Sequence, residues 1–188
     1  MRRLVVNLSR GAVCLLLVVA GCGPKTVPLV PTVSSPKFPD FVAPVVPLVL
    51  ANTRAAESER RGWMFLQAGD LKNAEREFSA ALKIAPAFYP AEAGLGYVGL
   101  ARTDPKAALT HFDRALEHQQ GDVSALVGRG QANLALGREA EALAAFEAAI
   151  AADPSLTDIT RRVEVLKFRG LGQGLADARA AAQAGRLD

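Results

Sequence analysis

The 188-residue sequence has few cysteines, and the two present, Cys14 and Cys22, both lie near its start. The body of the chain therefore offers no thiols for a disulfide framework or a cysteine-ligated metal site. Aromatic residues make up only 6% while hydrophobic residues make up 50%, so the apolar fraction is mainly Ala, Val and Leu. This composition favours closely packed helices over an aromatic-rich β-sandwich.

A surplus of one charge is also absent from the body of the chain. The net charge of +3 comes from 22 Lys and Arg against 19 Asp and Glu. Arg2, Arg3 and Arg10 belong to a segment that we expect to be removed, and without them 19 basic residues balance the 19 acidic ones. A neutral chain has no general field that attracts a phosphate backbone, so we expect no nucleic-acid partner.

Residues 1–21 have the anatomy of a signal peptide, with basic residues, an apolar stretch at 12–20 and a small residue before Cys22. The apolar stretch is about half of the ~20 residues that a membrane-spanning helix needs, so we expect no transmembrane span. Val19-Ala20-Gly21-Cys22 resembles the lipobox of bacterial lipoproteins. The resemblance implies acylation at Cys22, which would anchor the chain in the membrane. A plain secretory peptide is the alternative.

The anchor implies a location in the cell envelope. Gly23 follows the cysteine where an Asp would favour retention in the inner membrane. The lipobox resemblance therefore implies the outer membrane, facing the periplasm, in a cell with two membranes.

Residues 22–50 form a proline-rich linker that holds seven of the 11 prolines. Their spacing favours polyproline II, which would make a semi-rigid spacer between lipid and domain. Many of the remaining linker residues are apolar, which is unusual for a solvated spacer. The alternatives are that Phe38 to Leu50 docks on the first helices of the domain, or serves as a proline-rich ligand for another protein.

Residues 51–156 contain a repeat with a period of 34 residues, which predicts units at 55–88, 89–122 and 123–156. Each unit reads as two helices: Gly69 suits a helix end, Asp70 suits the N-cap of the next helix, and Pro86 suits its stop. The middle unit uses Asp104-Pro105 in the same way. The repeating columns are Gly62, Gly96 and Gly130; Ala74, Ala108 and Ala142; Phe78, Phe112 and Phe146; Ala81, Ala115 and Ala149; and Leu82, Leu116 and Ile150.

These columns resemble the tetratricopeptide repeat (TPR) family, over residues 55–156. The resemblance implies an all-α solenoid of helix-turn-helix units whose concave groove, lined by the first helix of each unit, binds a protein or peptide partner. Four residues depart from the family pattern because larger apolar side chains are usual there: Ser58, Arg61, Glu92 and Arg129.

Residues 157–188 are predicted to be C-terminal capping helices, with Thr157 as N-cap and an apolar stripe of Ile159, Val163, Leu166 and Phe168. Gly170, Gly172 and Gly174 predict a flexible break between these helices. Gln183-Ala184-Gly185 resembles Gln67-Ala68-Gly69, so another helix would be due where the sequence stops. A truncated chain is therefore one interpretation.

Two features that suggest chemistry have simpler explanations. Gly94 to Gly99 fits the G-x-G-x-x-G dinucleotide fingerprint, but no strand precedes it and the repeat places it within a helix, where we expect a packing role. His111 and His118 are the only histidines, and we expect both to be solvated or at an edge of the array. The sequence predicts no catalytic residue, no metal site and no small-molecule cofactor, and hence a protein that is not an enzyme.

One column of first-helix residues remains as a candidate groove site. Trp63 and Tyr97 are amphipathic rings suited to anchor a partner, although both could instead pack under the linker or between helices. The cationic clamp that family members use for C-terminal carboxylates is missing, which disfavours chaperone-tail recognition. The positions of that clamp hold Glu59, Ala93 and Val127 in this sequence. The complete set of candidate groove residues is Trp63, Tyr97, Gln131, Arg60, Leu66, Leu100 and Leu134.

The function expected from the sequence is a membrane-anchored TPR scaffold or adaptor that binds a protein or peptide partner in the cell envelope. One alternative is an accessory or truncated part of a larger envelope assembly, secretion or enzyme system. The other is a module autoinhibited by its own proline-rich tether.

Overall fold

The structure of the protein, a computed structural model, describes residues 29–184. The predicted signal peptide, Cys22 and residues 185–188 lie outside the described residues. Within residues 29–184, helices are the only regular elements. They are the 3-10 turn η1 (Leu48–Leu50) and seven α-helices: α1 (Arg54–Gln67), α2 (Leu71–Ile84), α3 (Tyr89–Ala101), α4 (Pro105–His118), α5 (Val123–Ala135), α6 (Glu139–Ala152) and α7 (Thr157–Gln183).

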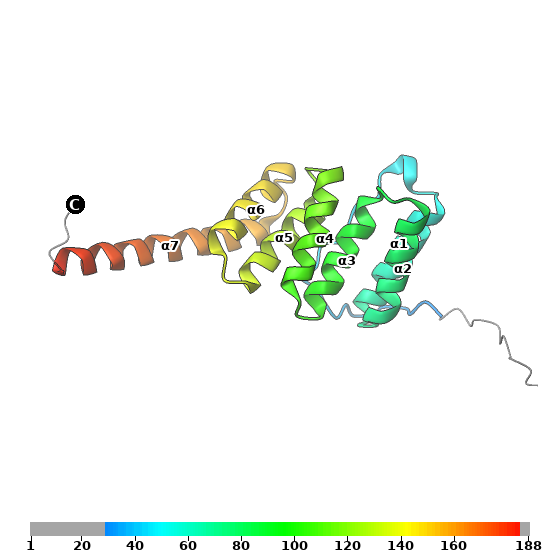
Figure 1. Ribbon diagram of the computed structural model, residues 1–188, viewed down its shortest axis with the longest axis horizontal. Coiled ribbons are helices and arrows are strands. Elements are labelled where there is room, and N and C mark those ends of the chain that lie inside the picture. The colour runs from blue at the N-terminus through cyan, green and yellow to red at the C-terminus, as the bar shows by residue number, and fades with distance from the viewer. Residues whose placement is uncertain (1–28, 185–188) are drawn as a thin grey trace, which may run out of the picture.

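The first six helices form three pairs that stack side by side, and each helix packs against the next (Figure 1). The first helices of the pairs, α1, α3 and α5, also contact one another and so line one face of the array. This arrangement confirms the all-α helical-repeat solenoid that the sequence predicts. Since each pair contacts only its neighbours, the face lined by α1, α3 and α5 is an extended surface suited to binding.

Short turns join the two helices of each pair, and the same position in each turn has a left-handed backbone. Gly69 (φ 81°), Thr103 (φ 58°) and Gly137 (φ 71°) take this position. The following aspartates cap the next helix as predicted in two of the three pairs. Asp70 accepts from the Asn73 N–H at 3.1 Å and Asp104 from the Ala107 N–H at 3.0 Å, which satisfies an otherwise unpaired helix-end donor.

The core repeats a single packing device, a phenylalanine ring held between two glycines of neighbouring first helices. Phe78 is fully buried, and a Cβ atom at Gly62 would lie only 2.7 Å from its ring. Gly94 closes the other side of the same ring. Gly96 and Gly128 flank Phe112 in the same way, so the glycines of the fingerprint-like segment have the packing role that we expected.

The C-terminal helix α7 corrects three predictions. It runs unbroken for 27 residues, so Gly170, Gly172 and Gly174 make no flexible break; a glycine lowers helix propensity but keeps its backbone hydrogen bonds. Thr157 is the first helical residue rather than the N-cap, a position that Leu156 takes without a side-chain bond.

The packing of α7 accounts for the third correction. Ile159, Val163 and Leu166 are buried as predicted, whereas Phe168 is 80% exposed. The first half of α7 contacts α6 as far as Arg169, and the rest extends away from the array (Figure 1). No helix within residues 29–184 combines the length and apolarity that crossing a bilayer requires.

Candidate functional site

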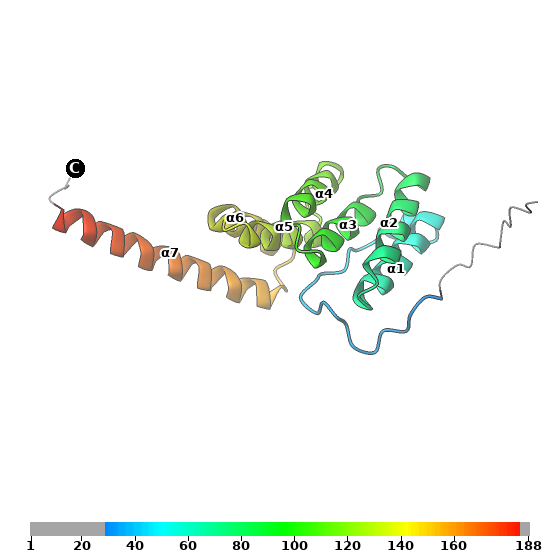
Figure 2. The same cartoon turned by 60° about the horizontal axis from the view of Figure 1, so that its bottom comes forward.

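A non-helical segment of the linker lies along the face formed by α1, α3 and α5 (Figure 2). We call residues 37–46 the strap. The strap begins beside the end of α1, where the Lys37 N–H donates to the Gln67 carbonyl at 2.8 Å. It crosses to α5 and returns through η1 to the start of α1. The concave face is therefore occupied by the chain's own segment, as one of the alternatives from the sequence states.

Two glutamine side chains hold the first half of the strap by its main chain. The Gln67 amide accepts from the Phe38 N–H at 3.3 Å and donates to the Phe38 carbonyl at 3.2 Å. Gln131 Nε2 donates to the Asp40 carbonyl at 2.8 Å. Both contacts bind backbone atoms, so they select the path of the strap rather than the identity of its side chains.

Val42 is held from two helices at once. The Tyr97 hydroxyl accepts from the Val42 N–H at 3.3 Å and donates to the Ser124 carbonyl at 2.8 Å. Ser124 Oγ in turn donates to the Val42 carbonyl at 2.7 Å. Tyr97 is fully buried, and this burial raises the pKa of its hydroxyl well above the ordinary value, so the hydroxyl stays protonated as a donor.

Aromatic rings connect the strap to the core of the array. The rings of Phe38 and Phe41 stack with centroids 4.9 Å apart and planes 8° apart, and Phe41 lies 4.7 Å from Tyr97. Tyr97 also meets Trp63 and Phe112 edge-on, at 5.6 and 5.1 Å. Tyr97 thus lies between the strap rings and the core ring of Phe112, so it links strap docking to the packing of the array.

The second half of the strap is held less closely. The Tyr89 hydroxyl donates to the Val45 carbonyl at 3.4 Å, a long hydrogen bond, and Val45 is 76% exposed. A cavity of about 300 Å³ lies beside this half, lined by residues that include Val42, Val45, Tyr89 and Ser124. The groove therefore keeps open space at its α5 end.

The carboxylate of a peptide ligand would find no cationic partner at the clamp column, the three positions where family members carry the cationic clamp. Glu59, Ala93 and Val127 are all buried there. Burial raises the pKa of Glu59 to about 7, and the nearby positive charge of Arg60 offsets only part of that shift. An ionised Glu59 would repel an acidic ligand at this column, in line with the sequence-based argument against chaperone tails.

The predicted groove residues divide into two groups. Tyr97 is buried, while Trp63 and Gln131 are half-buried; these three belong to the aromatic and hydrogen-bond contacts described above. Others lie apart from those contacts: Leu66 is fully buried in the core, Leu100 and Leu134 are half-buried beside it, and Arg60 is exposed.

Sequence reasoning missed two residues that bind the strap, Gln67 and Ser124. The available signal at Gln67 was a polar side chain in a column where the other units have Ala101 and Ala135. Ser124 has a similar signal, because the first unit has Ala56 in that column.

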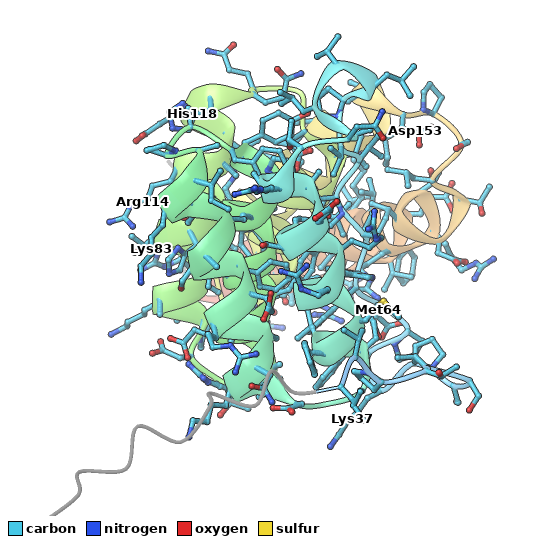
Figure 3. All side chains as sticks on the ribbon, turned by 90° about the vertical axis from the view of Figure 1, so that its right-hand side faces the viewer. Lys37, Met64, Lys83, Arg114, His118 and Asp153 are labelled. Atoms are coloured by element: carbon cyan, nitrogen blue, oxygen red, sulfur yellow. The ribbon has the colours of Figure 1, made fainter. Side chains whose placement is uncertain are left out.

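Three of the four polar residues that depart from the family pattern, Arg61, Glu92 and Arg129, pair with a residue on the second helix of a pair. Arg61 on α1 forms an ion pair with Glu77 on α2 at 2.8 Å, and Glu92 on α3 lies 2.8 Å from His111 on α4. His111 thus has a carboxylate neighbour within the array. Figure 3 places His118 with Lys83 and Arg114 on the side of the array away from Met64.

Comparisons with known proteins agree with this architecture. Residues 94–156 match the family model described as "Tetratricopeptide repeat". A mouse protein described as "FK506-binding protein-like" is 35% identical over 108 residues, which cover 53% of this chain but only 31% of that protein. The chain thus spans about a third of the length of this relative.

Solved structures share the fold at low sequence identity. The first TPR of Spaghetti (RPAP3), bound to the HSP90 peptide SRMEEVD, gives a TM-score of 0.58 at 17% identity, covering 65% of this chain and 94% of that one. The structure described as "TPR2B-domain:pHsp70-complex of yeast Sti1" gives a TM-score of 0.56 at 20% identity, covering 65% of this chain and 99% of that one. The stacked helix pairs, the matched residues 94–156 and these neighbours in fold together show that the chain folds as an all-α array of tetratricopeptide repeats.

Proposed function

We propose that the protein is a membrane-anchored TPR scaffold whose groove binds a non-helical segment of a protein partner in the cell envelope. The observation that carries the proposal is the strap, because α1, α3 and α5 already bind the main chain of such a segment with four side chains. These side chains are Gln67, Tyr97, Ser124 and Gln131.

Peptide binding is also supported by the neighbours in fold. The Spaghetti and Sti1 domains are both described in complex with chaperone peptides. This chain lacks a cation at the clamp column, so we propose a partner segment that is not recognised through a C-terminal carboxylate.

The envelope location and the membrane anchor rest on the lipobox resemblance at Cys22. Acylation there would place the groove near a membrane surface, at the outer membrane facing the periplasm in a cell with two membranes. The proline-rich linker then serves as both spacer and strap. Its first part would span from the lipid to the array, and residues 37–46 lie on the groove.

A second candidate function is a module that its own strap keeps closed. The observation that favours it is the same occupancy of the groove, since a partner must displace the strap to reach Tyr97. Both functions use one groove, and they differ in whether release of the strap is required before a partner binds.

The experiment is a crosslinking pull-down from intact membranes with matched variants. Trp63→Ala and Tyr97→Phe alter the groove, and the Tyr97→Phe change removes only the hydroxyl that binds Val42 and Ser124. Lys83→Ala and Arg114→Ala alter the opposite side as controls. We expect the groove variants to lose the partner and the controls to retain it. Equal capture by all four variants, each melting normally, would place the binding surface elsewhere.

A further inference from the structure

We propose that the groove selects a segment with two aromatic side chains three residues apart, brought together by a proline turn, and that the strap is a resident copy of this ligand. The proposal rests on the proposed function, because it names the ligand class of the same groove. An external partner would carry the same Phe-Pro-x-Phe chemistry and would compete with the strap.

The turn at Phe38 to Phe41 explains why the spacing matters. Side chains three residues apart point to opposite faces of a fully extended chain. Here the Phe41 N–H donates to the Phe38 carbonyl at 3.2 Å, which closes a turn, and Pro39 takes the second position, where its fixed φ is favoured. The turn stacks the two rings on each other, and Phe41 packs against Tyr97 at a tilt of 35°.

The four hydrogen-bonding side chains of the groove contact only main-chain atoms of the strap. Gln67, Gln131, Tyr97 and Ser124 bind main-chain atoms of the strap, so they accept any side chain whose backbone follows this path. Lys37 and Asp40 are exposed. Discrimination between ligands therefore falls on the two aromatic positions and on the half-buried Val42 and Val46.

The charge of the site excludes a different class of ligand. The strap side chains that touch the aromatic cluster are uncharged, and the clamp column holds the buried Glu59 rather than a cation. A segment recognised through acidic side chains would find no ion-pair partner at that column, whereas a neutral aromatic segment loses nothing there.

The strap is an imperfect ligand, which leaves room for a partner to replace it. Gln131 Oε1 is buried and has no hydrogen-bond donor within the described residues. A partner that brings an N–H to this oxygen would gain a bond that the strap does not make. The weakly held end at Val45, beside the cavity, is where displacement would begin. The strap also competes at an effective concentration on the order of millimolar, because only residues 47–53 separate it from α1.

The test measures fluorescence anisotropy of a labelled peptide with the sequence of residues 36–46, titrated with the full-length chain. In the F38A/F41A variant the resident strap loses both rings, so its hold on the groove weakens. We expect this variant to bind the peptide at least tenfold more tightly than the wild type does. Equal binding by the two proteins would overturn the competition between strap and partner.

Two control peptides test the ligand class. A peptide with both phenylalanines replaced by alanine should bind the F38A/F41A variant at least thirtyfold more weakly, since an aromatic anchor typically contributes that factor. The acidic peptide SRMEEVD should also bind weakly. If either control binds as tightly as the aromatic peptide, the ligand class is wrong while peptide binding by the groove survives. If no peptide binds and the membrane pull-down captures no partner, the proposed function fails as well.

A second variant covers the case in which F38A/F41A does not fold, as judged by its thermal melt. Val42→Pro removes the N–H that binds Tyr97 and leaves both strap rings in place. It too should bind the labelled peptide more tightly than the wild type, and failure to do so in a folded protein counts against the proposal.

Discussion

At the scale of single residues, two positions reduce the stability of the fold: Thr103 through its backbone conformation and Glu59 through its buried charge. Thr103 has a left-handed backbone in the turn where the neighbouring pairs have Gly69 and Gly137. A β-branched residue is disfavoured in that region because its Cβ crowds the backbone. Glu59 is a carboxyl group buried within α1, where ionisation is penalised.

We predict that Thr103→Gly raises the free energy of unfolding by about 1 kcal/mol, because glycine adopts the left-handed conformation without a steric penalty. Loss of the Thr103 Oγ1 bond to the Arg102 carbonyl offsets part of this gain. Urea unfolding curves measure the change. Thr110→Gly, inside α4, is the control and should lower stability by roughly 0.5 kcal/mol, because glycine is a poorer helix former than threonine. A loss at Thr103 equal to that at Thr110 would refute the strain argument.

We predict that Glu59 makes the protein less stable as pH rises from 5 to 8. The folded-state pKa of about 7 lies above the ordinary glutamate value of 4.5, so the folded state holds the proton more tightly. The loss of folding free energy is therefore absent below the unfolded-state pKa of 4.5, grows between pH 4.5 and 7, and is complete above the folded-state pKa.

The test compares Glu59→Gln with the wild type in urea at several pH values. The variant should gain up to roughly 3 kcal/mol relative to the wild type at pH 8, and little at pH 5. Glu57→Gln, at an exposed position of the same helix, is the control and should show no such trend. A pH-independent difference between Glu59→Gln and the wild type would contradict the predicted titration.

At the scale of elements, the spacing between helix pairs depends on glycines that hold a phenylalanine ring. Gly96 and Gly128 lie on either side of Phe112, which is fully buried and cannot move aside. The third ring, Phe146, has Gly130 on one side, while the guanidinium of Arg162 on α7 lies 5.9 Å from its centroid. The α6–α7 contact therefore differs from the contacts inside the array.

We predict that Gly128→Ala lowers the free energy of unfolding by about 1–3 kcal/mol, because the added methyl group collides with the Phe112 ring in a closely packed core. Gly172→Ala in α7 is the matched control, since nothing lies within 4 Å of its added Cβ. There the better helix propensity of alanine should raise stability slightly, by up to about 1 kcal/mol. Thermal melts of both variants measure the difference. If Gly128→Ala melts like the wild type, the ring is not tightly held.

At the scale of the whole molecule, the strap joins the linker to the array through the aromatic cluster around Tyr97. Trp63 is the chain's only tryptophan and contacts Tyr97 edge-on, so its fluorescence reports on this cluster. The predicted anchor at Cys22 lies only a short stretch of chain before the strap, so membrane attachment and groove occupancy involve one continuous segment.

We predict that deletion of residues 24–50 shifts the Trp63 emission to longer wavelength, because the cluster loses the cover of Phe41. The melting temperature should fall as well, since the strap's contacts with Tyr97 and Ser124 disappear. Leu29→Ala, at a residue that is 95% exposed, should change neither. Unchanged emission in the deletion variant would contradict docking of the strap over this face.

We predict that Cys22→Ser abolishes lipid labelling and membrane association. The proposed anchor depends on that thiol, and no helix within residues 29–184 is suited to cross the bilayer. Metabolic labelling with a fatty acid and membrane fractionation measure the two effects, with Cys14→Ser as the control that should keep both. A Cys22→Ser protein that stays bound after salt and carbonate washing would refute the lipobox interpretation.

The sequence alone determined the helix pairs, because their signals are local or repeat in every unit. A cap such as Asp70 bonds a backbone group three residues away, and the 34-residue columns of glycine and phenylalanine record contacts that every unit repeats. Trp63, Tyr97 and Gln131 could be found for the same reason, because first-helix residues one period apart share a face.

Tertiary structure decided what covers that face. The bonds from the strap to Gln67, Ser124 and Gln131 join residues 29, 82 and 91 positions apart, and they occur once rather than in every unit, so no period reveals them. The same holds for α7, where the glycines that suggested a break lie in a continuous helix. A glycine weakens helix propensity, but only the folded chain shows whether the backbone bonds on either side continue.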